Sequence, residues 1–488
     1  MTFAELTIDE LHTALRDRRI TSMELVDWYL ARIDAQDKAG AAIQAIVTVN
    51  PRARDEAAER DRYLSEHGDL AGPLHGVPVL VKDQAETAGL RTTFGSKLFE
   101  DYVPEADATV IERLRAAGAI ILAKTAMCDL AAGWFSSSSL TDHTKNPYQP
   151  DREAGGSSAG TGAGLAADFG LAGIGEDTGG SIRIPASFNN VFGLRVTTGL
   201  VSRAGFSPLV HFQDTPGPMG RTVADLARVL DAIVGYDPAD PFTAVAWPSA
   251  GGYANALDEA TPLGAFRCGV LETGFGSGPD AEPVSTVIRD AVARLTEWGT
   301  DIVAGLEIEN LPDWIADTSV YVKQSKSDIS RFLAARPAAP VHDFASVYDS
   351  GVFHPFNDLF HGIATGPDDI ERDSESQRLR LNQERFRRLV LNIFAANRLD
   401  FLVYPTVQVI PPTRAELLAK KYSALTFPTN TVIGSQAGLP AMSIPAGFTR
   451  DGLPVGMELL GTPHAERRML QFAQAWEKAA RPRKAPTL

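Results

Sequence analysis

Two short segments rich in glycine and serine constrain this chain more than any other feature of its sequence. The first is Gly-Gly-Ser-Ser-Ala-Gly at residues 155–160, and the second is Asp-Thr-Gly-Gly-Ser-Ile-Arg-Ile-Pro at residues 177–185. Upstream of both, Lys82 closes the apolar run 79–81, so we expect it at the buried end of a strand. Two hydroxyls and one amine are the parts of a nucleophile relay that needs no histidine.

The second segment has the composition of a nucleophile that carries its own oxyanion hole. A serine hydroxyl attacks an amide carbonyl only when a base removes its proton and fixed donors stabilise the developing oxyanion. Glycines before a serine leave backbone N–H groups open to a ligand, because no side chain covers them. We therefore predict that the N–H groups of Thr178, Gly179, Gly180 and Ser181 form the oxyanion hole, with Ser181 as the nucleophile.

Lys82 is the candidate base, and it can act only when its amine is neutral. An unperturbed lysine, with a pKa of about 10.4, is neutral in well under ~1% of molecules at pH 7. Burial lowers the pKa of a lysine, and a lysine that ends an apolar strand would be buried. Taken singly, each residue also has a plainer interpretation: Ser157 as part of a loop or helix start, Ser181 as a turn residue and Lys82 as a solvated strand end.

Together, the three residues resemble the amidase signature family, whose triad is Ser-cisSer-Lys. The resemblance is strong over residues 70–235 and returns more weakly near residues 400–475. It implies that Lys82 is the ultimate base, that Ser157 follows a cis peptide and relays the proton, and that Ser181 is the nucleophile. The separations, 75 residues from Lys82 to Ser157 and 24 from Ser157 to Ser181, agree with the family's usual spacing.

Neighbouring residues raise one alternative nucleophile and three supporting roles. Ser158 fits the G-x-S-x-G elbow of α/β-hydrolases, but the turn-rich loop 146–152 stands where that elbow requires a hydrophobic strand. We therefore expect Ser158 to support the site through a hydrogen bond. Asp177 and Arg183 brace the nucleophile loop in the family, and a local ion pair is the plainer expectation for them. Lys124 ends another apolar run without the family context and is interpreted as structural.

The sequence lacks the motifs of several other kinds of site. It contains no G-x-x-x-x-G-K-[ST] run, and its glycines at 160, 162 and 164 do not make the dinucleotide fingerprint G-x-G-x-x-G, so nucleotide binding is not expected. The 9 histidines form no H-E-x-x-H, and the 2 cysteines, Cys128 and Cys268, are too far apart for a zinc knuckle. We therefore expect neither a cofactor nor a metal.

Composition agrees with an enzyme that works in aqueous surroundings. The net charge is −15, and 44% of the residues are hydrophobic. Such an acidic chain favours solubility and argues against nucleic acid as a default partner. Residues 1–5 lack a basic and apolar leader, and no apolar run reaches the ~20 residues of a membrane span. We expect a cytoplasmic monomer or homodimer with a small-molecule amide substrate and no nucleic acid or membrane partner.

The order of the elements predicts an α/β fold. Thr7 and Thr21 each open a capping box, so the chain is expected to start with helices. A helix at 108–117 precedes the apolar strand 119–123, and the same alternation recurs up to a helix at 223–233. This alternation predicts a large mixed sheet covered by helices on both faces, in a single domain, as the resemblance also implies.

Within that single domain, residues 1–488, we expect four parts. Residues 1–65 would form N-terminal helices, 66–235 the catalytic core with the signature, 236–400 a variable substrate-pocket subregion, and 401–488 a return to the core. The variable part begins at a turn-rich surface crossing and carries eight aromatic residues between 300 and 370 without a clear helical or strand period. Core packing and lining of a substrate pocket are both open interpretations of these aromatics.

These features predict an amidohydrolase that works through an acyl-enzyme on Ser181. The substrate would be a carboxylic amide, with an aryl or bulky amide, a carbamate or an ester as variants. The alternative is the amidase-type subunit of a tRNA-dependent amidotransferase complex. Residues 214–219, Asp-Thr-Pro-Gly-Pro-Met, are more similar to stand-alone amidases, which favours the hydrolase. Gln84-Ala85 stand where many relatives carry Asn-Ile, so pocket details near Lys82 are not carried over.

Overall fold

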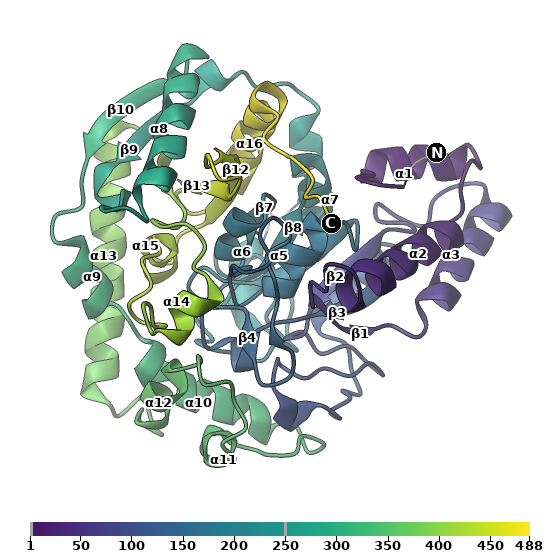
Figure 1. The fold of residues 1–488 in the computed structure, drawn as a ribbon, viewed down its shortest axis with the longest axis horizontal. Coiled ribbons are helices and arrows are strands. Elements are labelled where there is room, and N and C mark those ends of the chain that lie inside the picture. The colour runs from purple at the N-terminus through teal and green to yellow at the C-terminus, as the bar shows by residue number, and fades with distance from the viewer. Residues whose placement is uncertain (1–2, 248–250) are drawn as a thin grey trace.

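A mixed sheet of eleven strands organises the described part of the chain, which is residues 3–247 and 251–488 of a computed structural model (Figure 1). Residues 1–2 of the amino-terminal stretch and 248–250 of the predicted surface crossing lie outside the described residues. The strand order is β1-β3-β2-β6-β8-β7-β12-β13-β11-β9-β10. The strands are β1 (Ile46–Val49), β2 (Pro78–Lys82), β3 (Ile120–Thr125), β6 (Ala172–Glu176), β7 (Phe192–Arg195), β8 (Pro216–Gly220), β9 (Arg267–Leu271), β10 (Asp301–Leu306), β11 (Phe401–Pro405), β12 (Ala441–Phe448) and β13 (Pro454–Leu460), with β4 (Ser137–Ser138) and β5 (Asp142–His143) forming a separate pair.

Strand direction changes along this sheet. β3, β2 and β6 run parallel to one another, as do β11, β9 and β10 at the other end. The strands between them pair antiparallel, from β6 through β8, β7, β12 and β13 to β11. Every residue of β2, β3 and β6 is buried, which is typical of strands covered on both faces. The predicted large mixed sheet is confirmed.

Helices pack on this sheet and lie around it (Figure 1). α5 contacts β2, β3 and β6, while α8 contacts β11, β12 and β13. The helices are α1 (Ile8–Arg16), α2 (Ser22–Ile33), α3 (Ala53–His67), α4 (Thr109–Ala116), α5 (Ala159–Ala166), α6 (Arg183–Phe188), α7 (Val223–Ile233), α8 (Glu282–Glu297), α9 (Leu311–Asp317), α10 (Tyr321–Ala334), α11 (Phe344–Asp349), α12 (Leu359–Ala364), α13 (Ser374–Asn397), α14 (Arg414–Leu418), α15 (Thr431–Gln436) and α16 (Glu466–Ala480). Among the described residues, no helix combines the length and apolar character needed to cross a membrane.

Local sequence signals are matched closely at the amino-terminal half. Both predicted capping boxes form, with the Thr7 and Thr21 hydroxyls accepting from the N–H groups of Glu10 and Glu24. The helix expected at 108–117 is α4, the strand expected at 119–123 is β3, and α7 spans residues 223–233 as predicted. Each of these elements has a local cap, a stop signal or a clear apolar period, so the sequence predicts its bounds to within one or two residues.

The segment 236–400 contributes both to the sheet and to a second apolar cluster. Its strands β9 and β10 extend the sheet beyond β11, while most of the eight aromatic side chains between residues 300 and 370 pack in a cluster that includes α10, α11 and α12. Phe332, Phe344 and Phe360 are buried there, so core packing explains them. The division into four parts stays a prediction.

Candidate active site

Lys82 ends β2 and is fully buried. Its Nζ lies 2.8 Å from Ser157 Oγ and donates to the backbone carbonyl of Glu176 at 3.1 Å. Burial lowers the pKa of Lys82, and the nearby Glu176 carboxylate opposes that shift. The structure therefore places an amine of reduced basicity against the first of the two expected hydroxyls, out of contact with water.

The first glycine-serine segment is attached to the second through backbone contacts. The Gly156–Ser157 peptide is cis, as the family resemblance implied. The N–H of Ser158 donates to the carbonyl of Ser181 at 3.1 Å. The Ser158 hydroxyl lies 3.3 Å from both the carbonyl and the N–H of Glu176. Ser158 thus joins the two segments by hydrogen bonds, and its supporting role in the site stays a prediction.

Ser181 lies in the loop between β6 and α6. Its side chain is buried at 3% exposure, yet it lines a small cavity. Its hydroxyl has no hydrogen-bond partner among the described residues. The structure therefore brings Lys82 and Ser157 together and places the backbone of Ser181 beside this pair, but no hydrogen bond joins the two serine hydroxyls.

The four N–H groups expected to hold an oxyanion differ in their surroundings. The N–H of Gly180 already donates to Asp177 Oδ1 at 2.8 Å. Within the part of the chain that the structure describes, the N–H groups of Thr178, Gly179 and Ser181 have no acceptor. Gly180 has a φ of +129°, and a Cβ there would collide with the Thr431 hydroxyl, so only glycine fits. Gly180 thus shapes the loop, and the other three N–H groups are the open donors.

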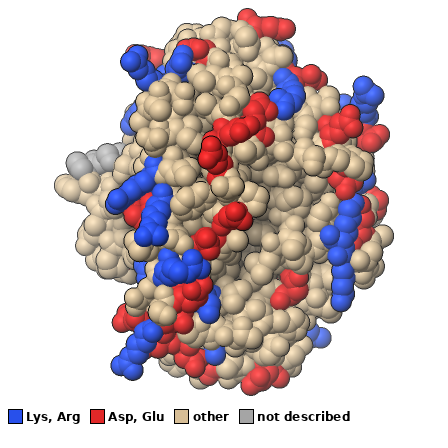
Figure 2. All heavy atoms as spheres, turned by 90° about the vertical axis from the view of Figure 1, so that its left-hand side faces the viewer, with Lys and Arg blue, Asp and Glu red and all other residues tan. Residues whose placement is uncertain are grey.

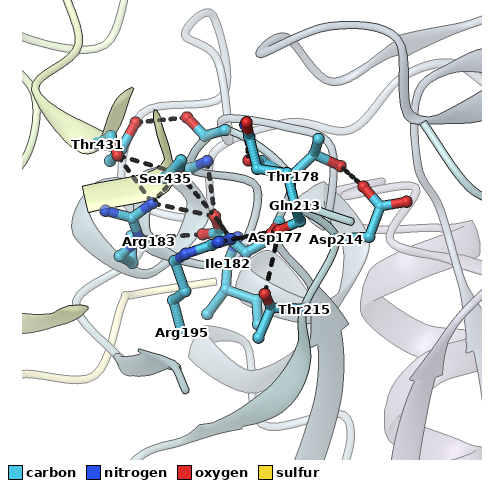
Figure 3. Close-up of polar contacts among 12 residues, drawn as sticks. Asp177, Thr178, Ile182, Arg183, Arg195, Gln213, Asp214, Thr215, Thr431 and Ser435 are labelled. Atoms are coloured by element: carbon cyan, nitrogen blue, oxygen red, sulfur yellow. Dashed lines mark hydrogen bonds and ion pairs between the residues drawn. The ribbon is translucent and has the colours of Figure 1, made fainter. Parts of the chain in front are cut away.

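Asp177 fixes this loop through a buried charge network (Figure 3). Arg183 donates to it from Nε and Nη2, each at 3.0 Å, and Arg195 Nη1 lies 3.2 Å from Asp177 Oδ1. Burial alone would raise the pKa of Asp177, but the two guanidiniums hold it well below its usual range. Arg183 also binds Glu458 of β13 and donates to Ser435 at 2.7 Å. The expected local ion pair of Asp177 and Arg183 is therefore part of a wider network that ties the loop to the carboxyl-terminal strands.

Glu176 is a buried residue beside Lys82 that sequence reasoning missed. Its Oε2 lies 3.5 Å from Lys82 Nζ, and both side chains are fully buried. A glutamate is usually solvated, which is why its place in the sequence raised no expectation. One signal could have found it: Glu176 ends a strand that runs parallel to the strand ending at Lys82, so the two side chains meet at one sheet edge.

Two adjoining cavities lie near the active site, and only the inner one is lined by the nucleophile loop. The inner cavity, about 20 Å³, is lined by Ser181 and Gly179 together with apolar side chains. The outer one, about 930 Å³, includes walls from α9, α13 and α15. Trp134, Tyr321 and Leu425 line both cavities, so the two adjoin. The Trp134 and Tyr321 rings pack edge to face, 6.3 Å apart.

Charged side chains of both signs line the outer cavity. The face drawn in Figure 2 is hollowed near its centre, and Asp and Glu side chains border the hollow. Glu307, Glu309 and Glu375 belong to the lining of the outer cavity, as do Lys323 and Arg378. Charged groups therefore occur in the outer cavity, whereas the inner one has none in its lining.

The histidine, cysteine and acidic side chains are the ones that could bind a metal ion. Over residues 3–247 and 251–488, no three of these side chains group in a way that could hold a metal ion. Cys128 and Cys268 are both buried free thiols.

Comparison with known proteins places this geometry in a family. The family model named Amidase matches residues 24–470. Two curated relatives are the A-type subunits of glutamyl-tRNA(Gln) amidotransferase from two bacteria. That of Ralstonia nicotianae is 36% identical over 500 aligned positions, covering 97% of each chain, and that of Symbiobacterium thermophilum is 36% identical over 476, covering 95% of this chain and 94% of the relative. Among solved structures, the native peptide amidase of Stenotrophomonas maltophilia superposes with a TM-score of 0.88 at 32% identity, covering 99% of each chain.

These relatives correct the expectation about partners. We expected a monomer or homodimer with a small-molecule substrate and no nucleic acid. The curated relatives are, by name, subunits of an enzyme that acts on a glutamyl-tRNA. The expectation is wrong because net charge describes the whole surface, whereas an acidic chain can still meet an RNA through a local face or through a partner protein. The chain belongs to the amidase family, with the amidase signature, and is an enzyme that hydrolyses amide carbon–nitrogen bonds.

Proposed function

We propose that this chain hydrolyses a carboxylic amide with an apolar acyl group through an acyl-enzyme on Ser181. The observation that carries the proposal is the 2.8 Å contact between Lys82 Nζ and Ser157 Oγ in a site without water contact, beside the Ser181 loop. A buried amine of lowered pKa is the kind of base that a serine relay requires.

In the proposed reaction, protons move from Ser181 through Ser157 to Lys82 and then back from Lys82 through Ser157 to the leaving amine. Neutral Lys82 takes a proton from Ser157, Ser157 takes the proton of Ser181, and Ser181 Oγ attacks the amide carbonyl. The Ser181 hydroxyl has no competing partner within the described residues and can turn toward Ser157. The amine leaves with the proton that Ser157 returns, and water then repeats the sequence on the acyl-enzyme.

The proposed oxyanion hole consists of the open backbone donors of the loop. The N–H groups of Thr178, Gly179 and Ser181 belong to the loop that carries the nucleophile. The N–H of Gly180 is not available, because it donates to Asp177. Donors that are already fixed cost no reorganisation when charge develops on the substrate oxygen. Asp177 and Arg183 are proposed to hold this loop, and Ser158 to hold the first segment against it.

The acyl preference is supported by the lining of the inner cavity, which is so small that only the part of the acyl group next to the carbonyl would enter it. Leu209, Leu359 and Leu425 contribute apolar surface there, and no charged side chain lines it. An ammonium or carboxylate on the acyl group would lose its hydration without an opposite charge. The outer cavity, with its mixed charges, would take the more distant part of the substrate. Carbamates and esters present the same carbonyl to Ser181 and belong to the same proposal.

A second candidate function is that of the amidase-type subunit in a glutamyl-tRNA(Gln) amidotransferase. It is favoured by the curated relatives, at 36% identity over nearly the full length of both chains. This support from sequence is more direct than that for the hydrolase, whereas the uncharged lining of the inner cavity favours the hydrolase. In the second function the amide nitrogen would be transferred to a glutamyl-tRNA instead of being released.

One experiment separates the two candidates and tests the nucleophile. The purified chain is assayed with apolar p-nitroanilides, primary amides, carbamates, esters and glutamine, and then with glutamyl-tRNA(Gln) and partner proteins. Turnover of apolar amides by the chain alone supports the hydrolase. Turnover of glutamine that requires the tRNA and partners supports the amidotransferase. In either case Ser181→Ala should lose essentially all turnover and remain folded, and activity above about a tenth of wild type contradicts Ser181 as the nucleophile.

A further inference from the structure

Glu176 is the only carboxylate that forms an ion pair with Lys82 among the described residues, and nothing in the proposed reaction uses it. It is the last residue of β6, next to β2 in the sheet. Its Oε2 lies 3.5 Å from Lys82 Nζ. The same Nζ lies 2.8 Å from Ser157 Oγ. Lys82 therefore contacts both the hydroxyl that would give it a proton and a carboxylate.

The orientation of Glu176 is fixed by its other oxygen. Oε1 accepts the N–H of Thr215 at 3.2 Å and lies 3.3 Å from the Thr178 hydroxyl. The Thr178 hydroxyl donates to Asp214 at 2.6 Å. Because Oε1 is committed to the loop before β8, Oε2 is left to face Lys82. The side chain is thus aimed at the lysine from a rigid strand end.

Resting on the proposed function, we propose that Glu176 is a positioning residue for the proton relay, whose carboxylate stabilises the ammonium that forms on Lys82. The proton balance is simple. One proton moves from Ser181 to Ser157 and one from Ser157 to Lys82, so that the nucleophile loses a proton and the lysine gains one. The positive charge then lies beside Glu176 Oε2. The amine leaves with one proton, and Lys82 returns to its neutral form.

The charged and titratable groups around this pair come from several elements. Lys82 is also faced by Cys128, from the loop after β3, and by Asp177. Glu176 is also faced by Asp214, from the loop before β8, and by Arg195 of β7. Burial raises the pKa of the Glu176 carboxyl to about 7, and Asp214 adds to that shift. Glu176 therefore carries its charge above neutral pH, where neutral Lys82 is needed.

The sign of the effect on pH dependence follows from this arrangement. Activity rises with pH as Lys82 loses its proton, so the acidic limb of the kcat/KM profile reports the pKa of Lys82. A carboxylate close to an ammonium raises its pKa, and the Glu176 charge does so here. Removing that charge should move the acidic limb to lower pH. It should also weaken Lys82 as the final proton acceptor and lower the plateau of kcat.

The test compares Glu176→Gln with wild type in steady-state kinetics on a p-nitroanilide from pH 5 to 10. We expect the acidic limb to move down by about one to three pH units. We expect the plateau of kcat to fall by about tenfold or more, while KM changes little. The Ser158 hydroxyl contacts only the backbone of residue 176, so the replacement of the side chain leaves these contacts in place. A residue with a merely structural role would lower activity without moving the limb.

A matched control is Glu477→Gln. Glu477 is another carboxyl whose pKa burial raises to about 7, but it binds the N–H of Val223 at the start of α7. Its replacement should leave the acidic limb where it is in wild type. If Glu176→Gln does not fold, Glu176→Asp keeps the charge but withdraws it from Lys82, and its limb should move in the same direction by less.

The outcomes separate this inference from the proposed function. An unmoved limb with kcat within twofold of wild type, in a protein that Ser181→Ala inactivates, overturns the role of Glu176 alone. Activity that survives in Ser181→Ala overturns the proposed function itself. A limb that moves equally in the Glu176 and Glu477 variants would also overturn the role of Glu176, because the shift would then be a general effect of removing a carboxyl of raised pKa.

Discussion

Two lysines lie buried on neighbouring parallel strands, and their surroundings differ. Lys82 on β2 contacts the Ser157 hydroxyl at 2.8 Å, with its nearest carboxylate at 3.5 Å. Lys124 on β3 lies 3.2 Å from the Asp83 carboxylate and donates to the Ala85 carbonyl at 2.6 Å. Burial lowers the pKa of both lysines, opposed in each case by the nearest carboxylate.

The comparison shows that burial alone does not make a lysine a base. Both lysines are fully buried, and both follow an apolar run in the sequence. Lys124 also contacts a hydroxyl, that of Thr92 at 2.8 Å, but this hydroxyl donates its own hydrogen to the Leu90 carbonyl at 3.2 Å. The close ion pair with Asp83 matches the charge of Lys124, so this lysine is not left to act as a base. Lys82 has a hydroxyl that can give up a proton, and its carboxylate is slightly farther away. The groups that each lysine contacts, and not how deeply it is buried, assign a chemical role to Lys82 and a structural role to Lys124.

The largest expected effect comes from Lys82→Met. Without the amine nothing accepts the proton of Ser157, so we expect kcat/KM to fall by about 10³-fold, within the range attributed to general-base catalysis. The fold should survive, since Glu176 can take up a proton once its partner is gone. Kinetics and circular dichroism of the purified variant check both statements. A folded variant that retains a tenth of wild-type activity would show that Lys82, like Lys124, has a structural role and is not the base.

Ser157→Ala interrupts the same path one step later. Lys82 would remain buried but would have no hydroxyl to deprotonate, and we expect a loss of about 10²- to 10³-fold in kcat. Binding should be less affected, so KM is expected to change little. Steady-state kinetics on the same p-nitroanilide measure both constants. Turnover near the wild-type level would show that Lys82 does not act through this hydroxyl.

Lys124→Met should act on stability instead of on chemistry. It leaves the Asp83 carboxylate buried without its cation, which costs about 3–5 kcal/mol when one partner of a buried pair is removed. Urea unfolding monitored by circular dichroism measures the loss. The fraction that stays folded should keep its kcat. A stable variant with a large loss of kcat would contradict the assignment of Lys124 to structure.

Thr92→Val is the smallest change in this set. The Thr92 hydroxyl accepts from Lys124 at 2.8 Å, so its removal leaves one ammonium hydrogen without an acceptor. We expect a loss of about 1–2 kcal/mol in the free energy of unfolding and no change in kcat, as measured by urea unfolding and steady-state kinetics. Set beside Ser157→Ala, it compares the loss of a hydroxyl at each lysine. An effect on kcat here would mean that the two lysine sites are coupled.

The sequence predicted those parts of the site that local motifs define. Residues 155–160 and 177–185 are recognisable by composition, and Lys82 by its apolar run, so their approach within one site could be foreseen from the family resemblance. The catalytic roles themselves stay predictions until the variants are measured. The fold could also be predicted from the sequence, because its strands and capped helices have clear local signals.

Other features depend on contacts between distant segments and were not visible in the sequence. Glu176 looks like an ordinary polar residue until the register of β6 against β2 places it beside Lys82. Gly180 was expected to offer its N–H to substrate, but the carboxylate of Asp177 takes it. Trp134 lines the cavity, and its carbonyl accepts the Gly156 N–H at 2.8 Å, a contact between segments that the sequence did not pair. Each of these depends on three-dimensional position and not on residue type.

The adjoining cavities bear on the order of events in a turnover. The inner space around Ser181 has room for about one water molecule, and it shares Trp134, Tyr321 and Leu425 with the wider space outside. A departing amine and an incoming water that both pass these three side chains must do so in succession. The lifetime of the ester intermediate then depends on how fast small molecules pass through this narrow passage. Small external nucleophiles such as hydroxylamine would therefore react with the acyl group more readily than bulky amines.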